Sequence, residues 1–234
     1  MVIWCASVSD CEEPSYSEET MAIDLITLEG EYVRLEPLER RHAALLVEAS
    51  AVDTSLYTWS LVPVGRKAVE RYIDTAIAWR DAGTAMPFVT VRKSDGKVIG
   101  STRFFELERW AWPEGSAHQG KHVFDTGEIG YTWLTAPAIR TAANTEAKLL
   151  MLAHAFETWK MCSVHLCTDE RNERSANAIL RIGAKFEGVL RAHRMAADFT
   201  PRNTKRFSIV AEEWPEVKRG LQGRLRTAFA KTSS

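Results

Sequence analysis

The chain has 234 residues, of which 45% are hydrophobic and 26% charged, which is the composition of a single globular domain and excludes two large ones. The formal net charge of −1 excludes an electrostatic reason to expect a nucleic-acid partner. No apolar run approaches the roughly 18 residues that span a bilayer, so we expect no membrane segment.

Residues 1–24 are rich in serine and glutamate, which is typical of a disordered extension. They lack the basic and apolar regions of a secretory signal, so we expect a cytosolic protein with reduced cysteines. The four cysteines include no CxxC pair, and we expect no metal site. The patterned sequence predicts one domain over residues 25–226. A tail over 227–234 follows, and we interpret the basic residues near it as a solvated helix face.

Alternating apolar and polar residues predict strands, and apolar residues at helical spacing predict helices. The predicted strands cover residues 31–38, 86–92, 98–106, 127–134, 163–168, 185–194 and 205–211. The predicted helices cover residues 39–51, 65–82, 144–158, 175–182 and 213–225. Residues 107–126 form a loop that is longer than most connections, a length often associated with function. This order predicts a mixed α/β fold in which helices pack against a central sheet.

The stretch 127–150 has the form of an anion-binding site, because a strand runs through a short loop directly into a helix. The first N–H groups of a helix lack partners and carry partial positive charge, which suits a pyrophosphate. Small residues there permit close approach of an anion to the backbone, and an arginine can add a charge-assisted hydrogen bond to it. Hydroxyl and amide side chains can donate hydrogen bonds to the anion or cap the helix. The candidates are Arg140, Thr141, Ala142, Ala143, Asn144 and Thr145. An alanine-rich helix start without a ligand is the alternative interpretation.

This stretch resembles the CoA-binding segment of the GCN5-related N-acetyltransferase (GNAT) superfamily. It is most similar to the ribosomal-protein-acetyltransferase-like (RimJ/RimL-type) branch, in which Arg-Thr-Ala/Gly-x-Asn-Thr-Glu-Ala-Lys follows an aromatic strand. The matching residues are Arg140, Thr141, Ala142, Asn144, Thr145, Glu146, Ala147 and Lys148. Ile139 departs from the superfamily pattern, which has Gln or Arg there.

Two further blocks extend the resemblance to residues 26–225. The first contains Asn172, Ser175, Gly183, Glu187 and Gly188, and the second is the closing FSIVAEEWP over residues 207–215. The resemblance implies the GNAT fold, with a mostly antiparallel mixed sheet flanked by helices, and acetyl-CoA as cosubstrate. It implies that strand 127–134 splays from strand 163–168. The pantetheine arm would lie in that gap against Trp133 and Leu134, with Asn172 and Ser175 as further cofactor contacts.

Acetylation of an amine requires a general base. Glu128 is the candidate because its strand should border the acceptor site; the alternative is a solvent-facing or ion-paired carboxylate. Glu106 and Asp125 are secondary candidates. Many superfamily members place a tyrosine acid at the position of Ile179. We therefore expect the thiolate to leave directly or with help from Ser175, which is otherwise a helix-start hydroxyl.

Candidate acceptor contacts lie in two regions. Tyr57 and Trp59 fall between the first two helices, where packing is the alternative role. Trp110 and Trp112 lie in the long loop, as a lid over the acceptor or as part of a dimer interface. Glu106 completes this set.

The resemblance implies transfer of an acetyl group from acetyl-CoA to a primary amine within a ternary complex. The acceptor is a protein N-terminus or a small-molecule amine. A non-catalytic CoA-binding module and a transferase for another acyl-CoA are the alternatives, and a homodimer is a family-level expectation.

Overall fold

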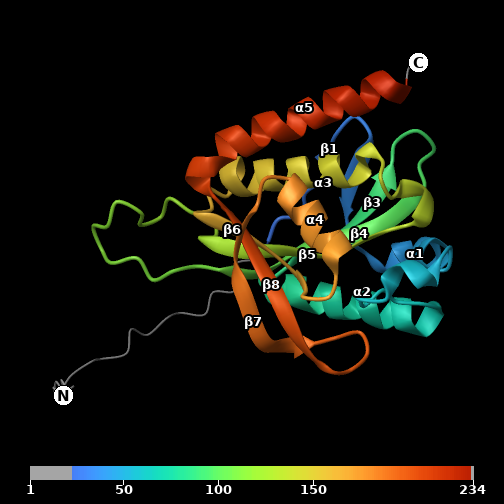
Figure 1. Cartoon of the computed structure of the whole chain (residues 1–234). Helices are drawn as coiled ribbons and strands as arrows, with labels where there is room; N and C mark the ends of the chain where they lie inside the picture. Colours follow the sequence, from blue (N-terminus) through green and yellow to red (C-terminus); the bar gives the residue numbers. More distant parts are fainter. Residues whose placement is uncertain (1–22, 233–234) are drawn as a thin grey trace.

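The computed structural model describes residues 23–232, so most of the predicted N-terminal extension lies outside the described residues. One eight-stranded sheet forms the centre of the molecule, in the order β1-β2-β3-β4-β5-β6-β8-β7 (Figure 1). Its strands are β1 (Leu28–Glu29), β2 (Val33–Pro37), β3 (Met86–Arg92), β4 (Val98–Glu108), β5 (Thr126–Leu134), β6 (Ser163–Asp169), β7 (Lys185–Met195) and β8 (Pro201–Val210). All neighbours are antiparallel except β5 and β6. The predicted mixed, mostly antiparallel fold is confirmed.

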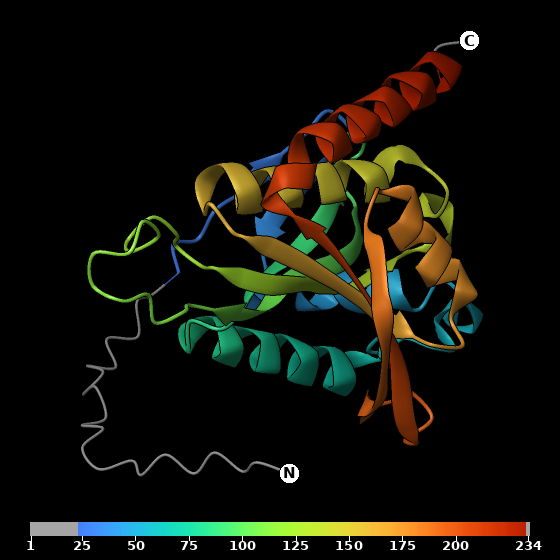
Figure 2. The same ribbon diagram turned by 60° about the vertical axis from the view of Figure 1, so that its left-hand side comes forward.

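Helices cover both faces of this sheet (Figures 1 and 2). The helices are α1 (Ala43–Ser50), α2 (Arg66–Asp81), α3 (Ala142–Ala153), α4 (Glu173–Arg181) and α5 (Trp214–Thr232). Short turns η1 (Arg40–His42), η2 (Thr54–Tyr57), η3 (Ala136–Ala138) and η5 (Ala211–Glu213) are 3₁₀-helical, and η4 (His154–Thr158) is π-helical. Among residues 23–232, no helix has the length and apolarity needed to cross a membrane.

Two hydrophobic cores lie on the two faces of the sheet because side chains alternate along each strand. Phe88 packs into the core beneath α3 and α5, whereas the next residue, Val89, packs against α1 and α2. Met151 of α3 and Leu221 of α5 belong to the first core, and Ile73 of α2 belongs to the second. The sheet is therefore held from both sides, which fixes the strands that carry the site.

The sheet opens between β5 and β6. These strands pair only over three positions, from Thr126↔Ser163 to Glu128↔His165, although both continue beyond them. A bulge bends β5 away at this point: its pairing with β4 skips two residues, and Tyr131 has a φ of +49°. The splay that the resemblance implied is therefore present.

Several elements differ from the predictions in their bounds. Strand β1 is too short to leave a sequence pattern, and β8 begins at Pro201 because polar residues at its start form a hairpin with β7. Helix α3 begins two residues early, at Ala142, because Thr141 caps it. Helix α5 continues to Thr232, beyond the predicted end of this helix at Leu225 and into the range predicted as the tail.

Candidate active site

Three cavities meet end to end at the opening between β5 and β6. We name them after one lining residue each. The Arg140 cavity has a volume of about 820 Å³, the Lys148 cavity about 120 Å³ and the Glu128 cavity about 430 Å³. The first two share Asn144, Ala178 and Ile182, and the last two share Gly130, Tyr131, Thr132, Cys167 and Ser175. Because neighbouring cavities share lining residues, they adjoin one another, and we refer to the three together as the channel.

The Arg140 cavity lies at the N-terminus of α3. Arg140 adopts a left-handed conformation with a φ of +65°, and the chain then turns into the helix at Thr141. The Thr141 hydroxyl accepts a hydrogen bond from the Ala143 N–H at 3.2 Å and donates one to the Ala138 carbonyl at 2.7 Å. Helix α3 therefore begins at a capped turn, and its first turn lies beside the Arg140 cavity.

Five of the six predicted cradle residues line this cavity, namely Arg140, Thr141, Ala142, Asn144 and Thr145. Ala143 is fully buried and packs into the core instead. Arg181 of α4 and Arg224 of α5 line the opposite wall. Three guanidinium groups around a helix N-terminus suit a ligand with several phosphates.

A buried carboxylate anchors α3 to the start of the sheet. Glu146 accepts hydrogen bonds from the backbone N–H groups of Glu31, Tyr32 and Val33 at 2.8, 2.7 and 2.6 Å. Gly30 permits this approach, because a Cβ atom there would lie 2.4 Å from Glu146 Cδ. The position of the cradle thus depends on a contact far away in sequence.

The Lys148 cavity contains a titratable group that matches the family motif but received no functional role from the sequence. Lys148 is only 5% exposed, and its Nζ donates to the hydroxyls of Thr132 at 2.7 Å and Thr102 at 3.3 Å. Burial lowers the pKa of Lys148 to about 7. The available signal was a lysine on the buried face of the predicted helix, between Ala147 and Met151.

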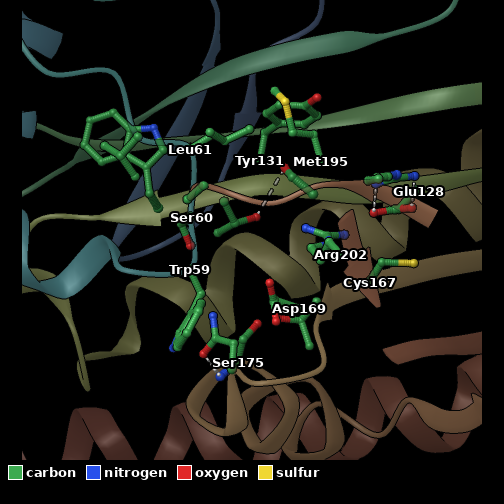
Figure 3. A pocket seen from close by; sticks show the side chains of 18 of the residues that line it. Trp59, Ser60, Leu61, Glu128, Tyr131, Cys167, Asp169, Ser175, Met195 and Arg202 are labelled. Atoms are coloured by element: carbon green, nitrogen blue, oxygen red, sulfur yellow. Dashed lines mark hydrogen bonds and ion pairs between the residues drawn. The ribbon is translucent and has the colours of Figure 1, made fainter. Parts of the chain in front are cut away.

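The Glu128 cavity is built around an ion pair (Figure 3). Glu128 of β5 is 4% exposed, and both of its oxygens accept from the Arg194 guanidinium, at 3.2 and 2.9 Å. Arg194 lies on β7 and also donates to both oxygens of the exposed Glu106, at 2.8 and 2.9 Å. The sequence analysis left an ion pair open as the alternative role of Glu128, and the structure shows such a pair.

The rest of this cavity combines aromatic and polar walls. Trp59 and Ser175 lie on one side of the view in Figure 3, and Glu128 and Cys167 lie on the other. Burial raises the pKa of the Cys167 thiol far above its usual value, and the negative charge of Glu128 adds to this. Trp133 also lines the cavity, and its Nε1–H is buried without a partner in the described structure.

A comparison of the sequence with protein-family profiles identifies the family of this chain. The profile of the acetyltransferase (GNAT) domain matches residues 33–185. The chain belongs to the GNAT family of acetyltransferases. This acetyltransferase is an acyltransferase, and its family uses acyl-CoA as the donor.

Solved structures agree with the family. A GCN5-related N-acetyltransferase from Brucella melitensis is 27% identical, covers 87% of this chain and 87% of that chain, and has a TM-score of 0.74. A T. thermophilus protein assigned to the acetyltransferases is 31% identical over 85% of this chain and 96% of that chain, with a TM-score of 0.69. Mycobacterium smegmatis RimJ, in complex with CoA-disulfide, shares the fold at 20% identity, 86% and 92% coverage and a TM-score of 0.66. Comparison with curated proteins gives no match.

Two of the three channel cavities have features that suit an acyl-CoA. The Arg140 cavity lies at a helix N-terminus and is lined by arginines, which suits phosphates, and the smaller Lys148 cavity adjoins it. Leu134 differs from the expectation: its carbonyl already accepts from the Tyr57 hydroxyl at 3.1 Å, and it lines none of the three cavities.

The helix α4 residues Asn172 and Ser175 lie where the channel widens. The Asn172 side-chain oxygen accepts from the Ser175 N–H at 3.0 Å and caps α4. Ser175 lines both the Lys148 and the Glu128 cavities, whereas Asn172 lines only the latter. Ile179 lines the Lys148 cavity, so an apolar side chain stands where many superfamily members have a tyrosine.

The predicted acceptor residues are only partly brought together. Trp59 lines the Glu128 cavity, and the Arg171 guanidinium lies 4.1 Å from its ring centroid. Tyr57 is buried behind the cavity, packed edge-on against Trp133 at 6.1 Å. Its contacts match the packing role that the sequence analysis gave as the alternative.

The loop tryptophans lie outside the Glu128 cavity. Asp125 is buried, and its two oxygens accept from the Trp112 Nε1–H at 2.6 Å and the Trp110 N–H at 2.7 Å. Trp112 stacks on His118 at 4.5 Å. Trp110 and Glu106 line a separate cavity of about 200 Å³ behind Glu128. These contacts with Asp125 hold the base of the loop 109–125 in place. Asp125 lines none of the three channel cavities.

One group among the described residues has the donor types of a metal site. A ring nitrogen of His122, an oxygen of Asp125 and the thiol of Cys162 lie within 4.8 Å of one another. The sequence analysis expected no metal site. The Asp125 oxygens already accept from the two tryptophans, and His122 Nδ1 faces the Lys160 carbonyl at 2.5 Å. These hydrogen bonds account for the cluster as part of the loop anchor.

Proposed function

We propose that this acetyltransferase moves an acetyl group from acetyl-CoA to a primary amine in a ternary complex. The observation that carries the proposal is the continuous channel from the arginine-lined N-terminus of α3 to the buried carboxylate of Glu128. Phosphates of CoA are expected to bind at Arg140 and the first turn of α3, and the pantetheine arm is expected to follow the gap between β5 and β6. The amine enters from the Glu128 cavity.

The chemistry requires three events. The amine nitrogen attacks the thioester carbonyl, the carbon–sulfur bond breaks, and the amine proton must be removed. Glu128 is the proposed acceptor of that proton, directly or through a water molecule. Arg194 holds the carboxylate in position through both of its oxygens.

The acceptor is proposed to carry a primary amine, either at a protein N-terminus or on a small molecule. The Glu128 cavity is lined by the carboxylates of Glu128 and Asp169, which can accept hydrogen bonds from an amine, and by Trp59, which adds an apolar wall for the stem of the amine. The motif similarity to the ribosomal-protein-acetyltransferase-like branch supports the protein N-terminus.

Release of free CoA thiol from acetyl-CoA across a panel of amines and N-terminal peptides tests this function. Glu128→Gln should lower kcat by about 10²-fold or more while the affinity for CoA stays unchanged. Glu106→Gln is the matched control, because Glu106 binds the same guanidinium on the exposed side and should change kcat only slightly. Equal losses in both variants would remove Glu128 as the base, and failure to bind CoA would end the proposal.

The acyl group is tested separately. Acetyl-CoA is expected to give a larger thermal stabilisation and faster thiol release than succinyl-CoA, because the Lys148 cavity is small. Faster turnover with the larger donor would assign a different acyl-CoA as the cosubstrate.

A further inference from the structure

Lys148 is a buried amine inside the channel, and the proposed mechanism does not use it. Its side chain reaches from α3 to the bulged part of β5, where Nζ donates to the hydroxyls of Thr132 at 2.7 Å and Thr102 at 3.3 Å. The two hydroxyls are themselves hydrogen-bonded at 2.8 Å. Among the described residues, no carboxylate lies within ion-pair distance of Nζ.

These contacts match the neutral form of the side chain. A neutral amine has two N–H donors and one lone pair. Two hydroxyl partners use both donors and leave the lone pair free. A buried ammonium without a counter-ion is unfavourable, and burial lowers the pKa of Lys148 to about 7.

The groups around Lys148 do little to favour the protonated form of its amine. The other titratable side chains that line the Lys148 cavity are Tyr131 of β5 and Cys167 of β6, and burial raises the pKa of both. Both are therefore neutral near pH 7. The carboxylate of Glu146, on the same helix, is bound to the backbone of β2 and its preceding turn.

The position of Lys148 is as important as its charge. Its cavity connects the Arg140 cavity to the Glu128 cavity, so an acyl-CoA that spans the channel passes the amine. Thr132, the closer hydrogen-bond partner of Nζ, lines both the Lys148 and the Glu128 cavities. The amine therefore lies beside the segment in which the thioester must sit for an acceptor near Glu128 to attack it.

We propose that Lys148 is a self-acylation site, which takes the acyl group from bound acyl-CoA when no amine occupies the Glu128 cavity. This inference rests on the proposed function, because it requires acyl-CoA in the channel. The Nζ lone pair attacks the thioester carbonyl, a carbon–nitrogen bond forms and the carbon–sulfur bond breaks. The proton lost by nitrogen passes to the departing thiolate, so the products are an amide at Lys148 and free CoA.

The test is peptide mapping by mass spectrometry after the full-length enzyme has been incubated with acetyl-CoA without an acceptor. One acetyl group is expected at Lys148, and saturating desulfo-CoA, which cannot donate an acyl group, should prevent it. Exposed lysines such as Lys67 are the internal control, because their chemical acetylation does not depend on the channel. Lys148 acetylation should reach half its maximal rate near pH 7.

Lys148→Arg provides a second control, because a guanidinium retains hydrogen-bond donors and cannot be acylated under these conditions. The wild-type map does not depend on how this variant folds. An unmodified Lys148, in an enzyme that binds CoA and acetylates an added amine, would overturn the inference and leave the proposed function intact. Absence of CoA binding, measured by thermal shift, would overturn both.

Discussion

Arg194 neutralises the buried carboxylate of Glu128, and this pair sets both the stability and the chemistry of the cavity. Removing the guanidinium alone leaves Glu128 buried and unpaired, which typically costs about 3–5 kcal/mol. Arg194→Met should therefore lower the free energy of unfolding by that amount in urea denaturation. The double variant Glu128→Gln/Arg194→Met should recover most of the loss. Glu106→Gln, at the exposed end of the network, should change stability by less than about 1 kcal/mol.

A second residue, Lys148, makes stability depend on pH. Its pKa is 10.5 in the unfolded chain and about 7 in the folded enzyme, so the unfolded chain binds more protons between these values. The contribution of Lys148 to the free energy of unfolding therefore increases as pH rises from 7 toward 10. The Lys148→Met variant has no amine to titrate at this position. Its free energy of unfolding should therefore exceed that of wild type by up to about 4 kcal/mol at or below pH 7, and the difference should shrink toward pH 10.

Urea denaturation of wild type and Lys148→Met at several pH values measures this difference. Lys67→Met, a change at an exposed lysine, should show no pH-dependent difference. A constant difference between Lys148→Met and wild type across pH 7–10 would mean that Lys148 keeps its ordinary pKa in the folded enzyme.

At the level of elements, the placement of α3 depends on the close contact of Gly30 with Glu146. Gly30→Ala would place a Cβ atom 2.4 Å from Glu146 Cδ and separate the carboxylate from its three backbone donors. The loss of these buried hydrogen bonds should lower the free energy of unfolding by about 2–3 kcal/mol. Gly220→Ala is the control, because nothing lies within 4 Å of a Cβ there and alanine favours the α5 helix by roughly 0.5–1 kcal/mol.

The contrast between β3 and α3 shows which elements the sequence could predict. Strand β3 is packed on both faces and bounded by turns, and its predicted bounds match the observed ones. The start of α3 was missed because Thr141 caps a helix that follows an extended Ile139 and a left-handed Arg140, conformations that no local pattern indicates. Local periodicity predicts the interior of an element, whereas its ends depend on caps and on distant contacts such as Glu146 with β2.

At the scale of the whole molecule, the candidate site combines parts that sequence reasoning could and could not find. The cradle at Arg140 was predicted because its residues are consecutive. Arg194 and Arg224 were missed because strand β7 and helix α5 bring them to the site from far along the chain. The basic residues near the C-terminus were interpreted as solvated, and one of them, Arg224, lines the Arg140 cavity. A site that closes across several elements is visible only once the sheet is assembled.

We therefore expect helix α5 to contribute to cosubstrate binding as well as to the core. Val217 and Leu221 pack α5 into the core beneath the sheet, and this packing places Arg224 at the Arg140 cavity. Arg224→Ala should raise the KM for acetyl-CoA by about five- to tenfold and leave kcat unchanged, because the contact is made equally in the ground and transition states. Arg219→Ala is the matched control on the same helix, since Arg219 is exposed and lines none of the three cavities. Steady-state kinetics at low and high salt measure the effect, which should shrink as salt screens the phosphate contact. Equal KM values for both variants would show that α5 serves only to cover the sheet.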